Sequence, residues 1–150
     1  MVKFAVSPHS RSILLVENDA LVRADIARML VAEGHRIAKA CDAHQGAGAI
    51  LHESFDLLII DVLFPGMRTI EALVARSRQA GRPRILGLCR FNRLFPDYYL
   101  SLSARLGVRV ILARPFNGPQ LAAAIGEAFD EEIADRGRWP VVAPSSMAVA

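Results

Sequence analysis

The sequence predicts an open parallel β-sheet covered by helices on both faces. Short apolar runs alternate along the chain with longer stretches whose apolar residues recur at helical spacing. Five such pairs follow one another within 150 residues, which is the length of one domain. Strands separated by helices pair in parallel, and strands buried on both faces are apolar throughout. The alternation therefore indicates the α/β class.

The first half of the chain predicts two strands and two helices. Residues 13–16 are an uninterrupted apolar run, and Gly34 suits the end of the helix that follows it. The apolar residues of that helix recur at helical spacing: Val22, Ile26, Met29 and Leu30. Residues 36–38 then predict a second strand, and residues 43–52 predict a short helix weakened by its glycines.

The second half continues the alternation. Residues 57–60 predict a buried strand, and residues 69–79 a helix with apolar residues on one face. Residues 84–88 predict the fourth strand, residues 98–105 the fourth helix, and residues 108–112 the fifth strand.

The last helix is the best marked in the sequence. Asn117 or Gly118 can cap it, and Pro119 suits its first turn. Its apolar residues recur every four positions: Leu121, Ile125, Phe129 and Ile133. Gly137 is a fitting stop, so this helix is expected to run to Arg136.

Composition excludes disorder for most of the chain and excludes a large multidomain enzyme. Apolar residues make up 53% and charged residues 22%, as in ordinary globular proteins. Cys41 and Cys89 make neither a disulfide framework nor a metal cluster, which favours a reducing compartment. No apolar run approaches the roughly 18 residues of a membrane helix, and a secretion signal is absent. We therefore expect a cytoplasmic protein without a membrane partner.

The net charge of +3 is mildly basic. Seven arginines lie between Arg68 and Arg93, with Glu71 as the sole acid among them. A solvated basic face is the favoured interpretation, ahead of docking to an acidic partner. Nucleic-acid binding is disfavoured, because neither stacking aromatics nor a recognition motif accompanies the arginines.

Polar residues follow the predicted strands where each one ends. Residues 17–19 (Glu-Asn-Asp) follow the first strand, Asp61 the third, Cys89 the fourth and Arg114 the fifth. Ligands of open parallel sheets bind beyond these carboxyl ends. Two structural readings stay open: Asp19 as a helix cap, and Asp61 as a strand-end acid paired with Arg114.

Three segments of the chain resemble the receiver domain of bacterial response regulators of the chemotaxis type. The first is residues 13–19, followed by Arg23 and Gly34. The second is residues 56–67, which contain Asp61, and the third is Gly107 with residues 110–116. The resemblance covers about residues 11–130.

The resemblance implies a flavodoxin-like three-layer sandwich with five helices and a five-stranded parallel sheet in the order 2-1-3-4-5. Residues 1–10 would then be an N-terminal extension, residues 11–130 the receiver, and residues 131–150 a last-helix extension with a C-terminal tail. We expect a stand-alone receiver that has no output domain and acts by docking.

The resemblance further implies a phosphorelay chemistry. Asp61 stands at the position of the aspartate that accepts a phosphoryl group from a histidine kinase or a phosphotransfer protein. A Mg²⁺ ion would be held by Glu17, Asn18 and Asp61, together with the backbone carbonyl of Leu63. Arg114 stands at the position of a lysine that contacts the phosphoryl group, and the matching Arg114–Pro115 bond is expected to be cis.

The chain departs from the family pattern around Asp61. Asn18 replaces an acid, so Mg²⁺ binding should be weaker, and Asn18→Asp should strengthen it. Cys89 replaces a hydroxyl residue, and a thiol is a weak hydrogen-bond donor. Arg114 keeps the charge of the usual lysine but is longer and planar. Ile111 replaces the switch aromatic of many members.

These departures leave more than one function open. Phosphoryl acceptance at Asp61 is the working hypothesis, and docking that does not depend on phosphorylation is the main alternative. A DNA-associated basic protein is less favoured. An enzyme that uses Asp61 on a small phosphorylated substrate is disfavoured, because the sequence shows no cap domain or substrate pocket elements.

The tail carries apolar residues that need a partner. Ile133 and Trp139 could form one small patch, which either folds back on the same subunit or docks a second molecule. The docking hypothesis takes a homodimer mate or a kinase as that molecule.

Overall fold

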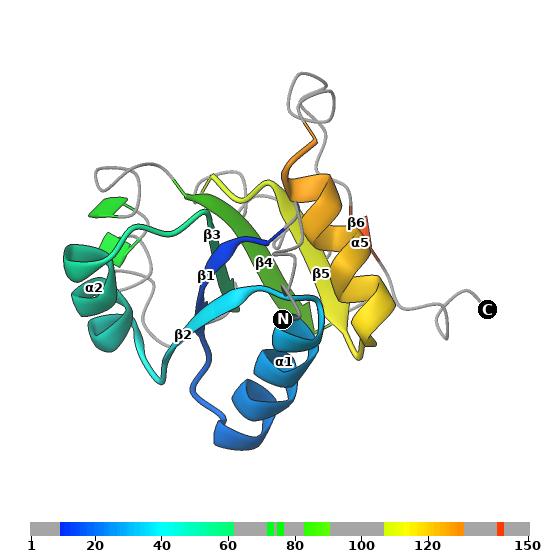
Figure 1. Cartoon of the computed structure of the whole chain (residues 1–150), viewed down its shortest axis with the longest axis horizontal. Coiled ribbons are helices and arrows are strands. Elements are labelled where there is room, and N and C mark those ends of the chain that lie inside the picture. The colour runs from blue at the N-terminus through cyan, green and yellow to red at the C-terminus, as the bar shows by residue number, and fades with distance from the viewer. Residues whose placement is uncertain are drawn as a thin grey trace, which may run out of the picture.

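The computed structural model describes residues 10–61, 72–73, 75–76, 83–90, 107–130 and 141–142. Its core is a six-stranded sheet with the order β2-β1-β3-β4-β5-β6, and every pair of neighbours is parallel (Figure 1). The strands are β1 (Ser12–Val16), β2 (Arg36–Ala40), β3 (Leu57–Asp61), β4 (Arg84–Arg90), β5 (Val110–Arg114) and β6 (Val141–Val142). The predicted flavodoxin-like order 2-1-3-4-5 is confirmed.

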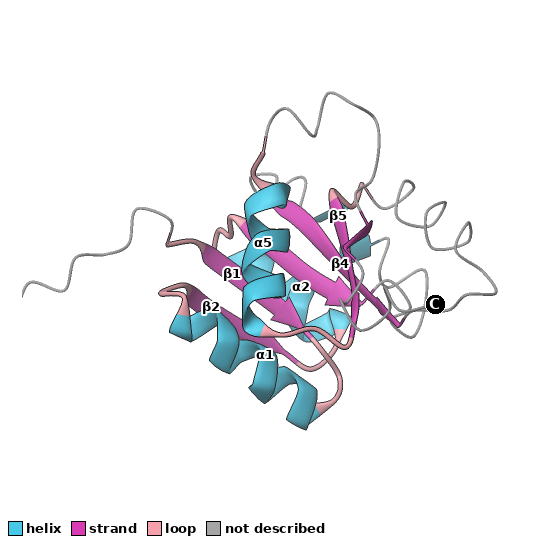
Figure 2. Ribbon diagram, turned by 90° about the vertical axis from the view of Figure 1, so that its right-hand side faces the viewer, coloured by secondary structure: helices cyan, strands magenta, loops and turns pink. Residues whose placement is uncertain are grey.

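Helices cover both faces of the sheet. Helix α1 (Ala20–Ala32) and helix α5 (Gly118–Ala128) lie on one face, and helix α2 (Ala43–His52) lies on the other (Figure 2). Residues 72–73 and 75–76 are helical as expected. The rest of the helix predicted at 69–79, and all of the one predicted at 98–105, lie outside the described residues.

Burial on both faces explains why the strands are apolar throughout. Alternate residues of β1 face opposite sides: Leu14 and Val16 pack with α2, and Ile13 and Leu15 pack with α1 and α5. All four are fully buried.

Side-chain caps define where the helices begin. Asp19 Oδ1 accepts the backbone N–H groups of Leu21 and Val22 at 2.9 and 3.1 Å, which confirms Asp19 as a helix cap. Asn117 and Gln120 form a capping box at the start of α5.

The glycines of α2 have a packing role, although the sequence suggests only a weak helix there. A Cβ atom at Gly46 would lie 3.0 Å from Val16 Cγ2. Gly46 therefore lets the helix approach β1 closely, and α2 remains regular from Ala43 to His52.

The last two predicted strands end later than expected. Strand β4 continues through Cys89 and Arg90, and β5 begins at Val110 and ends at Arg114. Cys89 pairs with Ala113 in this ladder. The boundaries were wrong because ladder hydrogen bonds come from the backbone and continue past the point where the side chains turn polar.

The last helix is shorter than the sequence predicts. It ends at Ala128, with Phe129 as its C-cap, so a continuous helix to Arg136 is wrong. Arg84 and Arg109 each donate to the Ala128 carbonyl at 3.2 Å, and these donors satisfy the helix end at this point.

Strand β6 was not expected from the sequence. Val141 pairs with Ile111, and Val142 pairs with Leu112, so this part of the tail lies on the edge of its own sheet. Ile133 and Trp139 lie outside the described residues, and the proposal that they dock a second molecule stays a prediction.

Candidate functional site

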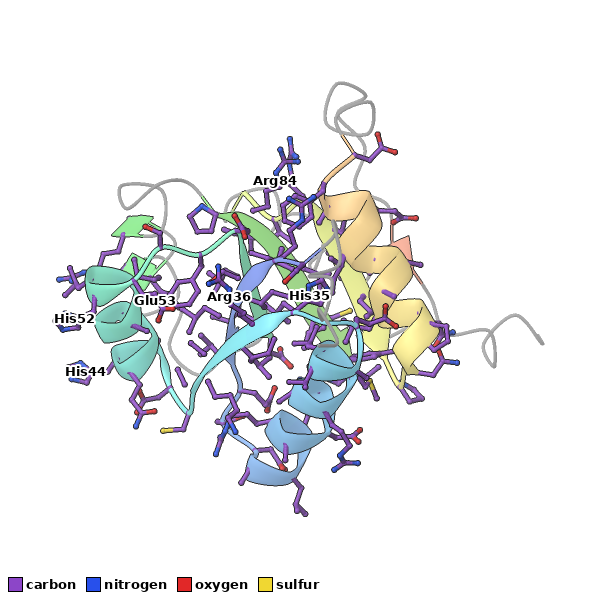
Figure 3. All side chains as sticks on the ribbon, viewed as in Figure 1. His35, Arg36, His44, His52, Glu53 and Arg84 are labelled. Atoms are coloured by element: carbon purple, nitrogen blue, oxygen red, sulfur yellow. The ribbon has the colours of Figure 1, made fainter. Side chains whose placement is uncertain are left out.

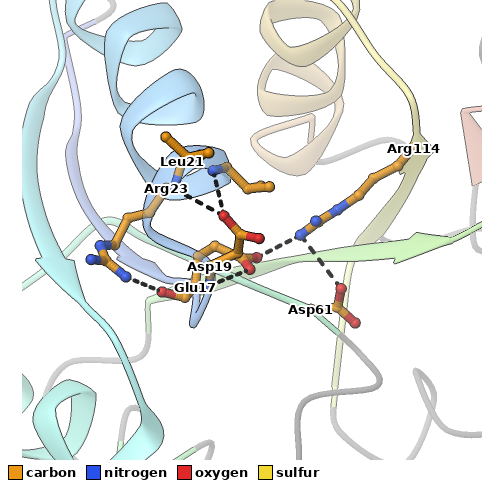
Figure 4. A network of polar contacts seen from close by, with 7 residues as sticks. Glu17, Asp19, Leu21, Arg23, Asp61 and Arg114 are labelled. Atoms are coloured by element: carbon orange, nitrogen blue, oxygen red, sulfur yellow. Dashed lines mark hydrogen bonds and ion pairs between the residues drawn. The ribbon is translucent and has the colours of Figure 1, made fainter.

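Parallel pairing gathers the chemically active side chains at the carboxyl edge of the sheet. Strands β1, β3 and β5 all run toward this edge, which brings Glu17, Asp61 and Arg114 together (Figure 4). Cys89, one residue before the end of β4, lies at the same edge. The fold therefore brings four of the predicted site residues to one edge of the sheet, as expected for residues at the ends of parallel strands.

Glu17 is the most buried of these residues, with 3% of its surface exposed. Its Oε2 atom lies 2.6 Å from Arg114 Nη2, and its Oε1 atom accepts the Asp19 N–H at 3.1 Å. The Glu17 carbonyl accepts a hydrogen bond from Arg23 Nη1 at 2.7 Å. Both carboxylate oxygens therefore have protein partners. The sequence motif contained Arg23, but nothing in it indicated this contact.

Arg114 joins the two carboxylates. The same Nη2 atom that contacts Glu17 lies 3.4 Å from Asp61 Oδ2, and the Arg114 and Asp61 side chains are 18% and 19% exposed. Asp61 therefore pairs with Arg114, which is the contact that the structural reading expected. In the described part of the chain, the buried Arg114 Nε atom has no hydrogen-bond acceptor. The Arg114–Pro115 bond is cis, as predicted.

Cys89 is a protonated thiol at neutral pH. Its pKa is raised to about 11, chiefly by burial and also by the Asp61 carboxylate, while the Arg114 guanidinium opposes both effects. A buried thiol of this kind is a poor nucleophile and a weak hydrogen-bond donor.

The remaining predicted positions differ in their surroundings. Asn18 is exposed, and Ile111 is buried in the core, where it pairs with Gly87 and Val141 in the sheet. Leu63 lies outside the described residues.

The histidines that the structure describes form no second centre. Figure 3 shows His44 and His52 along α2 and His35 well away from both. Across the described ranges, no cluster of at least three His, Cys, Asp or Glu side chains is arranged to hold a metal ion.

The family model described as response regulator receiver domain matches residues 13–126. The chain belongs to the response regulator receiver family. Among curated relatives, the Escherichia coli transcriptional regulatory protein CpxR is 34% identical over 113 residues, covering 75% of this chain and 47% of the regulator. The Pseudomonas aeruginosa sensor histidine kinase AruS is 29% identical over 124 residues, covering 82% of this chain and 12% of the kinase.

Solved structures show the same fold. A CheY-like receiver from Methanospirillum hungatei has a TM-score of 0.68 and 22% identity, with 85% of this chain and 99% of that chain covered. Vibrio cholerae CheY4 has a TM-score of 0.69 and 22% identity, with 80% and 99% covered. The chain thus has a receiver fold and spans less than half the length of the curated relatives above.

Family membership makes this chain a module of two-component signalling, in which receivers interact with histidine kinases or phosphotransfer proteins. Among its described helices, none has the length and apolar character needed to cross a membrane.

Receiver domains generally bind Mg²⁺ at the phosphorylation site, but the residues described here do not form a fitting set of ligands. Glu17 is engaged by Arg114 and by the Asp19 backbone, and Asp61 faces the same guanidinium. Asn18 offers a neutral amide where a charged oxygen is preferred.

Proposed function

We propose that this receiver accepts a phosphoryl group on Asp61 and signals by docking a partner protein. The observation that carries the proposal is the position of the Asp61 carboxylate. It lies at the carboxyl end of β3, is partly exposed, and has the Arg114 guanidinium 3.4 Å away. A nucleophile needs access to its substrate, and a transferring phosphoryl group needs positive charge beside it.

The transfer itself requires little beyond position and charge. An Asp61 oxygen attacks the phosphorus of a phosphohistidine on the donor protein, and a P–O bond forms as the P–N bond breaks. The electron pair of the broken bond stays on the imidazole ring, which leaves as neutral imidazole because its other nitrogen carries a proton. The product is an aspartyl phosphate on this chain.

Arg114 has a donor suited to this product. Its buried Nε–H, which has no acceptor within the described residues, can reach a phosphoryl oxygen once the guanidinium reorients. Arginine binds phosphate through parallel N–H groups. Arg114, which stands where the family has a lysine, therefore preserves phosphate recognition. Cys89 contributes a weaker donor than the hydroxyl it replaces.

The test is incubation with a small phosphodonor such as acetyl phosphate, followed by intact mass measurement. We expect the wild-type chain to gain one phosphoryl group and Asp61→Asn to gain none. Asp25→Asn is the matched control, because Asp25 is an exposed carboxylate on α1. Phosphorylation of Asp61→Asn at the wild-type rate would exclude Asp61 as the acceptor.

A second candidate is docking that does not depend on phosphorylation. The observation that favours it is the ion pairing of both Glu17 and Asp61 with Arg114, which gives each carboxylate a cationic partner without any modification. Partner affinity that is the same for wild type and Asp61→Asn, with and without acetyl phosphate, would support this candidate.

The partner we propose is a histidine kinase or a phosphotransfer protein, which the receiver meets in the cytoplasm. Light scattering tests whether the chain also forms a homodimer. A salt series tests the disfavoured alternative, because binding to DNA falls steeply as salt rises.

A further inference from the structure

The three charged side chains at the carboxyl edge of the sheet form a unit around one nitrogen atom. Arg114 Nη2 contacts Glu17 Oε2 at 2.6 Å and Asp61 Oδ2 at 3.4 Å. We infer that the Arg114 guanidinium is the permanent counter-cation of this site and keeps divalent cations out of it. The inference concerns the unphosphorylated protein, so it holds or fails independently of the proposed phosphoryl transfer.

Because Glu17 is buried, its carboxylate depends on the contact with Arg114. The Glu17 side chain is 4% exposed, and a charged group at that depth needs a counter-charge close by. Arg114 supplies the charge to one oxygen, and the Asp19 N–H satisfies the other. Before Glu17 could bind a metal ion, the guanidinium would have to leave it.

The rest of the 17–19 segment offers no replacement ligand of equal charge. Asp19 is committed to the start of α1, where its Oδ1 atom accepts two backbone N–H groups. Asn18 is exposed and neutral. Each carboxylate of this segment therefore already has a role in the fold.

The guanidinium is also a cation that the protein cannot lose. Arginine stays protonated at all physiological pH values, whereas a bound metal ion depends on its free concentration. Arg114 is the last residue of β5, and it follows Leu112 and Ala113, which are fully buried. Figure 4 shows its side chain extending across the edge of the sheet toward Glu17 and Asp61.

This inference differs from the expectation based on the sequence alone. The sequence attributes weak metal binding to the missing acid at Asn18, whereas the structure assigns it to Arg114. Asn18→Asp and Arg114→Gln change the net charge of the site by the same amount. Comparing the two variants therefore separates the two explanations.

The experiment measures Mg²⁺ affinity by calorimetry and follows Mn²⁺ through paramagnetic broadening of NMR signals near Asp61, without any phosphodonor. We expect the wild type to bind only weakly, and affinity at least about tenfold tighter in Arg114→Gln. Asn18→Asp should change affinity less than about twofold, because Arg114 still holds both carboxylates. Arg28→Gln, which breaks an exposed pair with Asp25, controls for the loss of an arginine and should behave as wild type.

Three outcomes would overturn the inference. They are wild-type binding as tight as that of Arg114→Gln, an Arg114→Gln variant that remains folded without gaining affinity, and a tenfold or larger gain from Asn18→Asp alone (~1.4 kcal/mol). Amide NMR spectra establish whether each variant is folded. If Arg114→Gln does not fold, the wild-type and Asn18→Asp titrations still decide between the explanations.

Discussion

Arginines stand at both ends of the sheet, but they have different partners. At the carboxyl end, Arg114 contacts two carboxylates, and at the amino end, Arg84 and Arg109 both donate to the carbonyl of Ala128. That carbonyl belongs to the end of α5, where a helix has unsatisfied acceptors and partial negative charge. The arginines of the amino end therefore complete the fold.

The amino end is further tied together by an aromatic ring. The guanidinium carbons of Arg11 and Arg84 lie 4.0 and 4.9 Å from the centre of the Phe129 ring. The backbone N–H of Arg11 donates to His35 Nδ1 at 3.0 Å. This network links the starts of several strands to the end of α5.

The two ends differ in what their cations face. At the amino end, the contacts described above join arginines to a backbone carbonyl and to an aromatic ring, neither of which undergoes a reaction. At the carboxyl end, Arg114 contacts ionised carboxylates, and Asp61 is open enough to meet another molecule. Partner chemistry and access, rather than the presence of arginine, distinguish the functional end of this sheet from the structural one.

The largest effect that would test this distinction is the reactivity of Cys89. A pKa of about 11, against an ordinary 9.0, leaves about 100-fold less thiolate at neutral pH. We expect iodoacetamide to modify Cys41 first and Cys89 far more slowly, as measured by peptide mapping of the native protein. Asp61→Asn should speed the reaction of Cys89, because it removes a charge that raises the thiol pKa. Equal rates at the two cysteines would contradict the assignment of Cys89 as an inert thiol.

At the amino end, we expect Phe129→Ala to have the largest effect on stability. The substitution removes a partly buried ring and two cation–π contacts, so the free energy of unfolding should fall by about 2–3 kcal/mol. Urea denaturation measures the change. Leu51→Ala is the control, because that side chain is 66% exposed and its loss should cost less than about 0.5 kcal/mol. A loss of stability as small as that of the control would show that the Phe129 ring does not stabilise the amino end.

Much of the fold could be predicted from the sequence because both faces of the sheet are covered. Strands such as Leu57–Ile60 are apolar throughout, and this pattern needs no knowledge of distant residues. Strand and helix ends were harder to predict, because they depend on contacts across the fold. The end of α5 is satisfied by Arg84 and Arg109, and no local signal at Phe129 predicts those donors.

In the site, too, local features could be predicted from the sequence and contacts between distant residues could not. The residues at the strand ends could be predicted, because parallel strands bring their carboxyl ends to one edge. The pairing of Arg114 with Glu17 could not, since these residues are 97 positions apart and the motif suggested a metal ligand at Glu17. Strand β6 was also missed, because a run as short as Val141–Val142 has no recognisable period.

A double-mutant cycle tests the strength of the Glu17–Arg114 contact. We expect Glu17→Gln to lower the free energy of unfolding by about 1–2 kcal/mol, less than for a fully buried pair because Arg114 is partly exposed and keeps Asp61. Combined with Arg114→Gln, the coupling energy from urea unfolding should be about 1 kcal/mol. The exposed Arg28–Asp25 pair should give about 0.3–0.5 kcal/mol in the same cycle. A coupling energy no larger than that of the Arg28–Asp25 pair would show that the Glu17–Arg114 contact is no stronger than a surface ion pair.

The smallest expected effect is a pH dependence at the amino end, through His35. Burial lowers the pKa of His35 below 6.5, with Arg11 acting in the same direction and Glu33 opposing them. The unfolded chain then binds a proton more readily than the folded one, so stability is complete above 6.5 and decreases as the pH falls through that value. Protonation also removes the Nδ1 acceptor for the Arg11 N–H.

His35→Gln provides the comparison, because its side-chain oxygen can accept a hydrogen bond but does not titrate. Urea midpoints measured from about pH 8 to about pH 5 should fall more steeply for wild type than for this variant. Subtracting the two curves removes the contribution of the carboxylates that both proteins share. Identical slopes would mean that the neutral His35 acceptor does not stabilise the start of β1, and the amino-end network would then depend on its arginines and Phe129 alone.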